Sequence, residues 1–153
     1  MATVRLADYR PAPFLIPEIA LTLQLFADHT LVQADLSLEP NPAAASESLA
    51  PQSESLAPQS VSPAKKAEPL EFRAEALEVL EMQLDGQPLP AEAWRQESGR
   101  LLLLAPPNRP FQLHTRVRLH PEANTGLEGL YVSGGLFTTQ CEAEGFRRIT
   151  PHP

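Results

Sequence analysis

The chain has 153 residues, a formal net charge of −7 at pH 7 and a pI near 5.0. This length fits one domain, and the roughly 120 residues outside a low-complexity segment are enough to bury a modest core. The acidic charge argues against a nucleic-acid partner, because the phosphates would be repelled. No apolar run reaches the length of a membrane span or a signal peptide, so we expect a cytoplasmic protein without membrane contact.

Two alternating segments near the start of the chain predict a β-hairpin. Apolar side chains occupy every second position on both sides of a turn at residues 27–30: Ile19, Leu21, Leu23 and Leu25, then Val32, Ala34, Leu36 and Leu38. Successive side chains of a strand point to opposite faces, so we expect one buried and one wet face. His29 is expected to be an exposed turn residue, because no neighbour has the spacing of a second metal ligand.

Residues 41–68 differ from the rest in composition. The seven residues SESLAPQ at 46–52 repeat without change at 53–59. A seven-residue period is typical of coiled coils, but Pro51 and Pro58 recur within it and would break a helix. We therefore predict a disordered Pro/Ser-rich insert over 41–68, between the first strands (1–40) and the remainder of a β domain (69–150).

The second half of the chain again has strand patterns. Apolar positions between residues 77 and 84 fit either strand parity, and Asp85-Gly86 predicts a tight turn after them. Trp94 is expected to be a packing anchor. The apolar run 101–104 has the length of a buried strand.

Residues 111–120 alternate strictly between apolar and polar side chains. His114 and His120 share the polar face with two arginines, and these positive neighbours disfavour a bound metal cation. We therefore interpret both histidines as structural or solvated. The patterns together predict an all-β domain of mostly antiparallel strands, with helix as a minor component.

The segment 124–150 is the most informative about function. It holds five of the seven glycines, which predicts tight turns and close backbone approach. An extended backbone over residues 139–144 would place Gln140, Glu142 and Glu144 on one face. An amide and carboxylates held together can accept hydrogen bonds from an ammonium group. Residue chemistry alone favours the other interpretation, a solvated strand face that pairs with Arg147 and Arg148.

The motifs NTGLEGLY, at 124–131, and CEAEGFR, at 141–147, closely resemble the end of the N-terminal domain of the zinc-dependent aminopeptidase N family. The resemblance extends to most of the chain outside residues 41–68. It implies a saddle-like β-sheet domain. It also implies that Gln140 and Glu142, by their positions in the motif, lie at the mouth of an active site and help to bind the free α-amino group of a peptide substrate.

The catalytic parts of that family are missing from this sequence. Neither the HExxH helix, which supplies zinc ligands, nor the GxMEN loop occurs in it. The chain departs from the family pattern at residues 151–153, which we interpret as a truncated end. We expect no catalytic residue, no metal ligand and no cofactor in this chain, with zinc in a separate or absent catalytic domain. That domain, in cis or in trans, and the N-terminus of a peptide are the expected partners.

Two functions of different classes remain open from the sequence. The favoured one is the N-terminal β domain, or a truncated fragment, of an aminopeptidase N-like zinc metallopeptidase, which anchors the substrate amine without catalysing a reaction alone. The alternative is a stand-alone, non-catalytic β-sandwich module that binds a peptide or protein.

Overall fold

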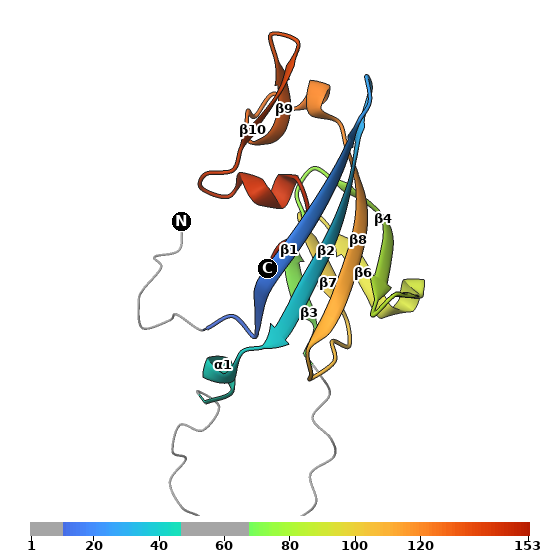
Figure 1. Ribbon diagram of the computed structural model, residues 1–153, viewed down its shortest axis with the longest axis vertical. Coiled ribbons are helices and arrows are strands. Elements are labelled where there is room, and N and C mark those ends of the chain that lie inside the picture. The colour runs from blue at the N-terminus through green and yellow to red at the C-terminus, as the bar shows by residue number, and fades with distance from the viewer. Residues whose placement is uncertain (1–10, 47–67) are drawn as a thin grey trace, which may run out of the picture.

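A computed structural model describes residues 11–46 and 68–153 (Figure 1). These ranges consist mainly of β-strands, which confirms the predicted all-β class. The strands are β1 (Phe14–Leu25), β2 (Thr30–Pro40), β3 (Leu70–Arg73), β4 (Glu78–Leu84), β5 (Gln87–Pro88), β6 (Trp94–Glu97), β7 (Arg100–Leu103), β8 (Phe111–Leu119), β9 (Gly129–Ser133) and β10 (Leu136–Gln140). The helical elements are the α-helix α1 (Pro42–Ser46) and the 3-10 helices η3 (Ala91–Ala93), η4 (Pro121–Ala123) and η5 (Gly145–Arg148).

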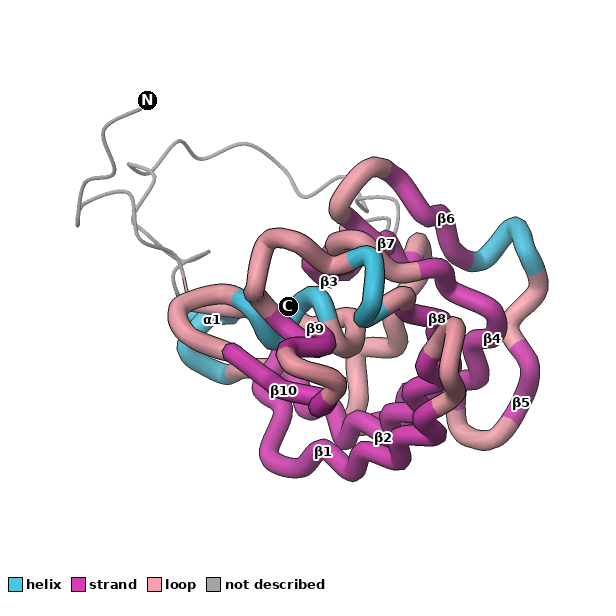
Figure 2. Tube along the Cα trace, turned by 90° about the horizontal axis from the view of Figure 1, so that it is seen from above, coloured by secondary structure: helices cyan, strands magenta, loops and turns pink. Residues whose placement is uncertain are grey.

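The strands form two antiparallel sheets and a separate hairpin. The larger sheet has the order β1-β2-β8-β4-β5 and the smaller one the order β3-β7-β6. Viewed from above, the two sheets are distinct layers (Figure 2). The β9–β10 hairpin projects at one end of the molecule, near the turn between β1 and β2 (Figure 1). This hairpin and the segment after it carry the motif of residues 124–150.

The core lies between the two layers and follows the alternation seen in the sequence. On β2 and β8, directly opposed residues such as Leu36 and Leu113 point inward, and both are fully buried. They share one apolar cluster with Phe72 of β3 and Leu101 of β7. The predicted hairpin over β1 and β2 and the predicted strand over β8 are therefore confirmed. β2 and β8 each bury one face, but the buried face expected on β1 is only half-buried at Ile19 and Leu21 and is exposed at Leu23 and Leu25.

A β-bulge explains why the parity of residues 77–84 is ambiguous. Val79 pairs with Val117, but Glu81 pairs with the preceding residue of β8, so β4 has one extra residue at Leu80. The bulge lets Val79 and Met82 both point into the core although they are an odd number of positions apart. The predicted tight turn at Asp85-Gly86 is present, and both residues have positive φ.

The smaller sheet agrees with the sequence in most respects. The predicted strand over residues 101–104 is β7, which ends at Leu103 and buries Leu101 and Leu103, while Leu102 is only half-buried. This alternation arises because only one face of the three-stranded sheet meets the core. Trp94 packs against the core cluster from β6, as predicted.

The predicted insert lies largely outside the described residues, which omit 47–67. Its first part forms the short helix α1. Asn41 holds the start of this helix, because its side-chain oxygen accepts a hydrogen bond from the Ala43 N–H at 3.0 Å and its amide donates to the Ala12 carbonyl at 2.7 Å.

Candidate functional site

Gln140 and Glu142 lie where the β9–β10 hairpin ends and the chain reverses. Gln140 is the last residue of β10 and pairs with Gly129 of β9. The next residues form a turn rather than a strand, and the Gly145 N–H donates a hydrogen bond to the Cys141 carbonyl at 2.9 Å. The expected extended backbone over residues 139–144 is present at residues 139–140, which end β10, and is wrong beyond them. Glu142 lies on the turn that follows Gln140, so strand alternation does not place these two side chains on one face.

The close approach of Gly145 to the hairpin makes this turn possible. A Cβ atom on Gly145 would lie 2.0 Å from the Gln140 carbonyl oxygen and 2.8 Å from the Gly129 nitrogen. Those atoms belong to the backbone and cannot move aside as a flexible side chain can. Only glycine fits at 145, and this contact folds the chain back at the end of β10.

The five side chains of residues 140–144 are all exposed. A strand would have placed Cys141 and Ala143 on the face opposite Glu142, but a turn has no inner face to bury them. No hydrogen bond or ion pair joins the Glu142 carboxylate to another described residue. Glu142 therefore presents a free carboxylate on a fixed backbone.

The neighbouring acidic residues are paired. Glu144 contacts Arg147 at 2.6 Å and Glu128 contacts Arg148 at 3.4 Å. The predicted pairing of this motif with Arg147 and Arg148 thus holds for Glu144 and not for Glu142. Sequence analysis missed Glu128 and the more distant Glu75, which also contact these arginines. No local pattern links position 75 to position 147.

A hollow of about 420 Å³ lies beside the turn. Its lining includes Arg73, Ala143, Arg147 and His152, whereas Gln140 and Glu142 do not line it. The backbone of His152 pairs with Arg73, so the end of the chain is attached to β3. Glu144 also lines this hollow and is paired there with Arg147, so the hollow presents charges of both signs, and the unpaired Glu142 carboxylate lies on the exposed turn outside it.

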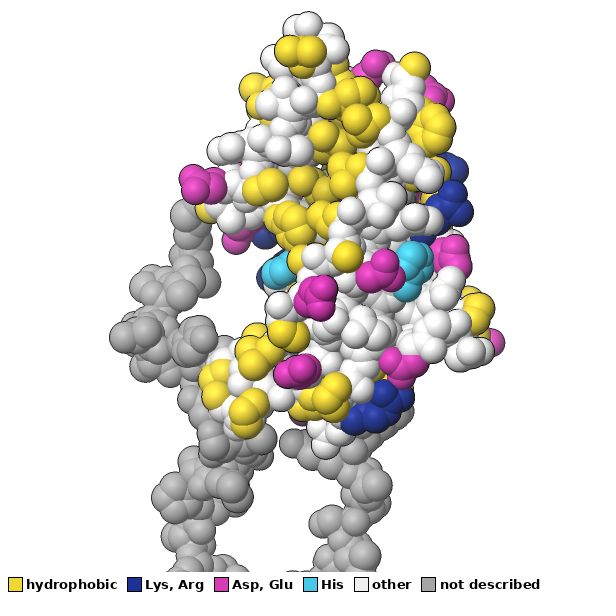
Figure 3. Space-filling view, in the orientation of Figure 1, with side chains coloured by type: hydrophobic (Ala, Val, Ile, Leu, Met, Phe, Trp, Pro, Cys, Tyr) yellow, Lys and Arg dark blue, Asp and Glu magenta, His cyan; other side chains and the backbone are white. Residues whose placement is uncertain are grey.

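Exposed apolar side chains lie at the same end of the molecule as the hairpin (Figure 3). On β10, Leu136 is 72% and Phe137 is 41% exposed. Leu23 and Leu25 near the end of β1 are 40% and 49% exposed, because the smaller sheet does not cover that end of the strand. Leu130 on β9 is buried instead, since it packs into the core cluster.

The part of the chain that the structure describes contains no group of three or more side chains arranged to hold a metal ion. Each histidine contacts another group of the chain instead. His114 Nδ1 lies 2.8 Å from Asp35 Oδ1, and His120 Nδ1 lies 3.0 Å from the Asp28 carbonyl oxygen. These residues do not provide the ligands for a zinc ion. None of the described helices is long and apolar enough to cross a membrane.

Comparison with known proteins finds relatives that match this chain over nearly its whole length. The chain is 38% identical to aminopeptidase N of Caulobacter vibrioides over 150 residues, which cover 98% of the chain and 15% of that protein. It is homologous to the N-terminal region of aminopeptidase N. The enzyme of Escherichia coli K12 is 35% identical over 143 residues, which cover 94% of the chain and 14% of that aminopeptidase N. The chain therefore spans about one seventh of these relatives' length. No family model matches it.

Solved structures show the same fold in aminopeptidases. Legionella pneumophila aminopeptidase A, in complex with aspartic acid, has a TM-score of 0.74 at 21% identity over 98% of this chain and 15% of that one. A Deinococcus radiodurans M1 zinc metallopeptidase bound to a Tyr-Ser-Ala substrate has a TM-score of 0.61 at 17% identity over 92% of this chain and 29% of that one. These likenesses show a shared fold, and the homology to aminopeptidase N above assigns the chain to its N-terminal region.

Proposed function

We propose that Gln140 and Glu142 bind the α-ammonium group of a peptide substrate when this β domain is joined to, or associated with, an aminopeptidase catalytic domain. The carrying observation is the Glu142 carboxylate, which is unpaired on a turn whose backbone is fixed, while Glu128 and Glu144 are paired with arginines. Homology to aminopeptidase N supplies the class of ligand.

Exposure explains why the domain alone would bind an amine weakly. A carboxylate surrounded by water contributes under about 1 kcal/mol to an ion pair, whereas a charge-assisted hydrogen bond in a water-poor site contributes a few kcal/mol. A catalytic domain that covers the turn would exclude water from Glu142. The site becomes effective only when the two surfaces meet.

The apolar surface beside the turn supports such a partner. Leu136 and Phe137 are exposed on β10, the strand that ends at Gln140. Exposed apolar groups of this kind typically mark a protein interface. A partner that buries them would lie next to Glu142, with the substrate amine between the two proteins.

In the proposed role, this chain sets the position of the substrate relative to the catalytic domain. An ammonium group held at a fixed place sets the distance to the first peptide carbonyl of the substrate, and cleavage then occurs one residue from the amino end. The described residues of this chain offer no zinc ligand set, so zinc and the chemical step belong to the catalytic domain. Gln140 and Glu142 bind and orient the substrate.

The test is Glu142→Gln in this chain, combined with the catalytic domain of an aminopeptidase N in cis or in trans. The substitution keeps the shape of the side chain and removes its charge. We expect kcat/KM for substrates with a free amine to fall by roughly 10- to 1000-fold, which corresponds to about 1.4 to 4 kcal/mol of transition-state stabilisation. Gln140→Ala should lower it less, because a neutral amide makes a weaker bond.

Glu144→Gln is the matched control. It removes the same charge two residues away, from a side chain that faces Arg147 rather than the substrate. Because the Glu144 side chain is 66% exposed, its pair with Arg147 contributes little to the position of the turn, and kcat/KM should stay close to that of the parent. Unchanged activity in Glu142→Gln would refute the ammonium role and favour the alternative of a stand-alone binding module.

A further inference from the structure

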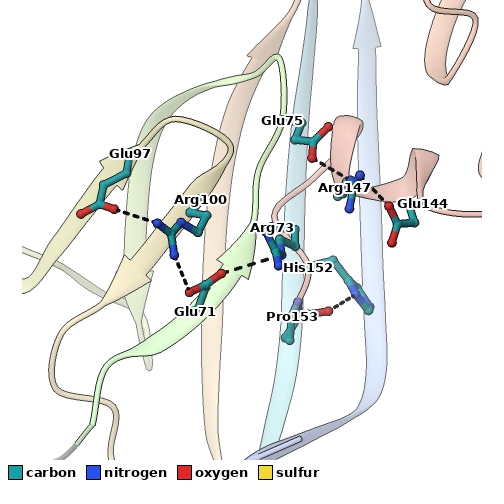
Figure 4. Close-up of polar contacts among 9 residues, drawn as sticks. All are labelled: Glu71, Arg73, Glu75, Glu97, Arg100, Glu144, Arg147, His152 and Pro153. Carbon is teal, nitrogen blue, oxygen red and sulfur yellow. Dashed lines mark hydrogen bonds and ion pairs between the residues drawn. The ribbon is translucent and has the colours of Figure 1, made fainter. Parts of the chain in front are cut away.

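Glu75 lies on the loop between β3 and β4, far from the turn in sequence. Its carboxylate faces Arg147 (Figure 4) and also contacts the next residue, Arg148. One oxygen lies 3.0 Å from Arg147 Nε and the other 3.5 Å from Arg148 Nη2. The Glu75 N–H also donates a hydrogen bond to the Arg147 carbonyl at 3.1 Å. Glu75 therefore holds both the side chains and the backbone of η5.

Arg147 and Arg148 also contact carboxylates at two other places in the segment 124–150. Arg147 Nη2 reaches Glu144, the last residue before η5, and Arg148 Nε reaches Glu128, the residue before β9. The side chains of Glu75, Arg147 and Arg148 are each only 24% to 28% exposed. Glu75 is thus the central carboxylate of a partly buried chain of charges that spans the segment carrying Gln140 and Glu142.

Other contacts of the turn are local or belong to the hairpin. The Glu144–Arg147 pair and the Gly145–Cys141 hydrogen bond both join residues within the same seven positions. The close approach of Gly145 ties the turn to β9 and β10. Glu75 ties η5 to the loop after β3, next to the core residues Ala74 and Leu77. Together with the buried Ile149 and the backbone pairing of His152 with Arg73, it fixes the turn relative to the main body of the domain.

We infer that Glu75 is a positioning residue, which holds the turn so that Glu142 points at the substrate ammonium. The inference rests on the function proposed above for Glu142. The Nε atoms of Arg147 and Arg148 are buried and have no partner with hydrogen-bond geometry, so the ion pairs with Glu75 and Glu128 are what compensates them. Without the Glu75 charge, the partly buried guanidinium groups of Arg147 and Arg148 lack a negative partner. The turn then shifts so that both arginines reach water.

The first experiment uses the full chain without a partner. In Glu75→Gln, hydrogen exchange of the Gly145 amide should become faster by about tenfold or more, because local opening of the turn becomes easier. Amides of β2 and β8 should exchange as in the parent. Glu71→Gln is the control, since Glu71 on β3 also contacts two arginines, Arg73 and Arg100, but does not touch η5 (Figure 4).

The second experiment is a double-mutant cycle in the reconstituted enzyme. Glu75→Gln should reduce kcat/KM for free-amine substrates by about 3- to 30-fold in the parent and by less than about twofold in the Glu142→Gln background, because a positioning residue has nothing to act through once Glu142 is neutral. An equal loss in both backgrounds would show general destabilisation and overturn the inference.

The two proposals fail in different ways. If Glu142→Gln matches the parent while Glu75→Gln still loosens Gly145, the ammonium role is wrong and only the mechanical role of Glu75 stands. If Glu142→Gln is impaired but exchange in Glu75→Gln is unchanged, the inference about Glu75 is wrong. Should Glu75→Gln fail to fold, Arg147→Lys replaces it. Lysine keeps the charge but cannot contact Glu75 and Glu144 together, so hydrogen exchange of the Gly145 amide should again become faster. Unchanged exchange in Arg147→Lys would contradict the inference.

Discussion

The β2–β8 pair and the turn that carries Glu142 are stabilised in opposite ways. Nine consecutive cross-strand pairs join β2 to β8, and a row of apolar side chains on each strand fills the core. The turn has one backbone contact too close for any Cβ and a few partly exposed ion pairs. Many similar contacts together stabilise the β2–β8 pair, whereas single contacts determine the backbone geometry of the turn.

This difference separates stability from function in the molecule. The free energy of folding comes mainly from apolar burial between the two sheets. The proposed binding side chains, Gln140 and Glu142, lie on a segment that adds little buried area of its own. Substitutions in the two regions should therefore affect different measurements, and the predictions below test that separation from the largest effect to the smallest.

The largest effect is expected in the core. Leu113 on β8 is fully buried, so Leu113→Ala should lower the free energy of unfolding by about 2 to 5 kcal/mol through lost burial and a cavity. Urea denaturation measures this change. The control is His114→Ala on the opposite face, where the lost contact with Asp35 is partly exposed and should contribute under about 1 kcal/mol. Comparable losses in both variants would mean that the inner face does not dominate stability.

A smaller effect is expected in the turn. Gly145→Ala places a methyl group against the Gln140 carbonyl, which should destabilise the domain by about 1 to 3 kcal/mol and displace the turn. The control is Gly126→Ala in the same motif, where the nearest atom to a new Cβ is Arg148 Nη1 at 3.4 Å. Urea denaturation measures the loss of stability, and hydrogen exchange of the amide at position 145, which donates to the Cys141 carbonyl, measures the displacement of the turn. Equal behaviour of the two alanine variants would contradict the tight contact at Gly145.

The core was predictable because its pattern is local and repetitive. The alternation of apolar residues in β2 and β8 identifies the buried face without knowledge of the partner strand. The Asp-Gly pair likewise identifies the β4–β5 turn, because both residues tolerate positive φ. The bulge at Leu80 shows the limit of this approach, since a single extra residue reverses the parity of everything after it.

The candidate site was predictable only in part. Gln140 and Glu142 came from the resemblance, but the strand expected to present them stops at Gln140, because Gly145 folds back onto Gln140. Glu75 gave no signal at all. The loop beside it contains Ala76 with a φ of +54°, a conformation that alanine rarely adopts and that no sequence pattern announces. Contacts between distant segments decide this site, and local periodicity does not report them.

The smallest predicted effect concerns the turn between β4 and β5. Like the β2–β8 pair, this turn has a local sequence pattern, and like the turn that carries Glu142, it depends on the contacts of a single residue. Asp85 accepts hydrogen bonds from the Gln112 N–H at 2.9 Å and from Arg109 Nη2 at 2.6 Å. These contacts lower the pKa of Asp85 below its usual 3.8, the backbone hydrogen bond being the larger cause. A carboxyl group whose pKa is depressed in the folded state stabilises the protein above its unfolded pKa, and this contribution is lost as the pH falls through the lower folded value.

Asp85→Asn isolates this charge, since asparagine keeps the acceptor for Gln112 and also tolerates positive φ. The parent should be slightly more stable than the variant near neutral pH, and the difference should shrink below about pH 4 and vanish when Asp85 is protonated. Because Asp85 is exposed to solvent, salt should reduce the difference as well. Urea midpoints of both proteins across this pH range measure it. A stability difference between the two proteins that stays constant below pH 4 would show that the shape of Asp85, and not its charge, suits the turn.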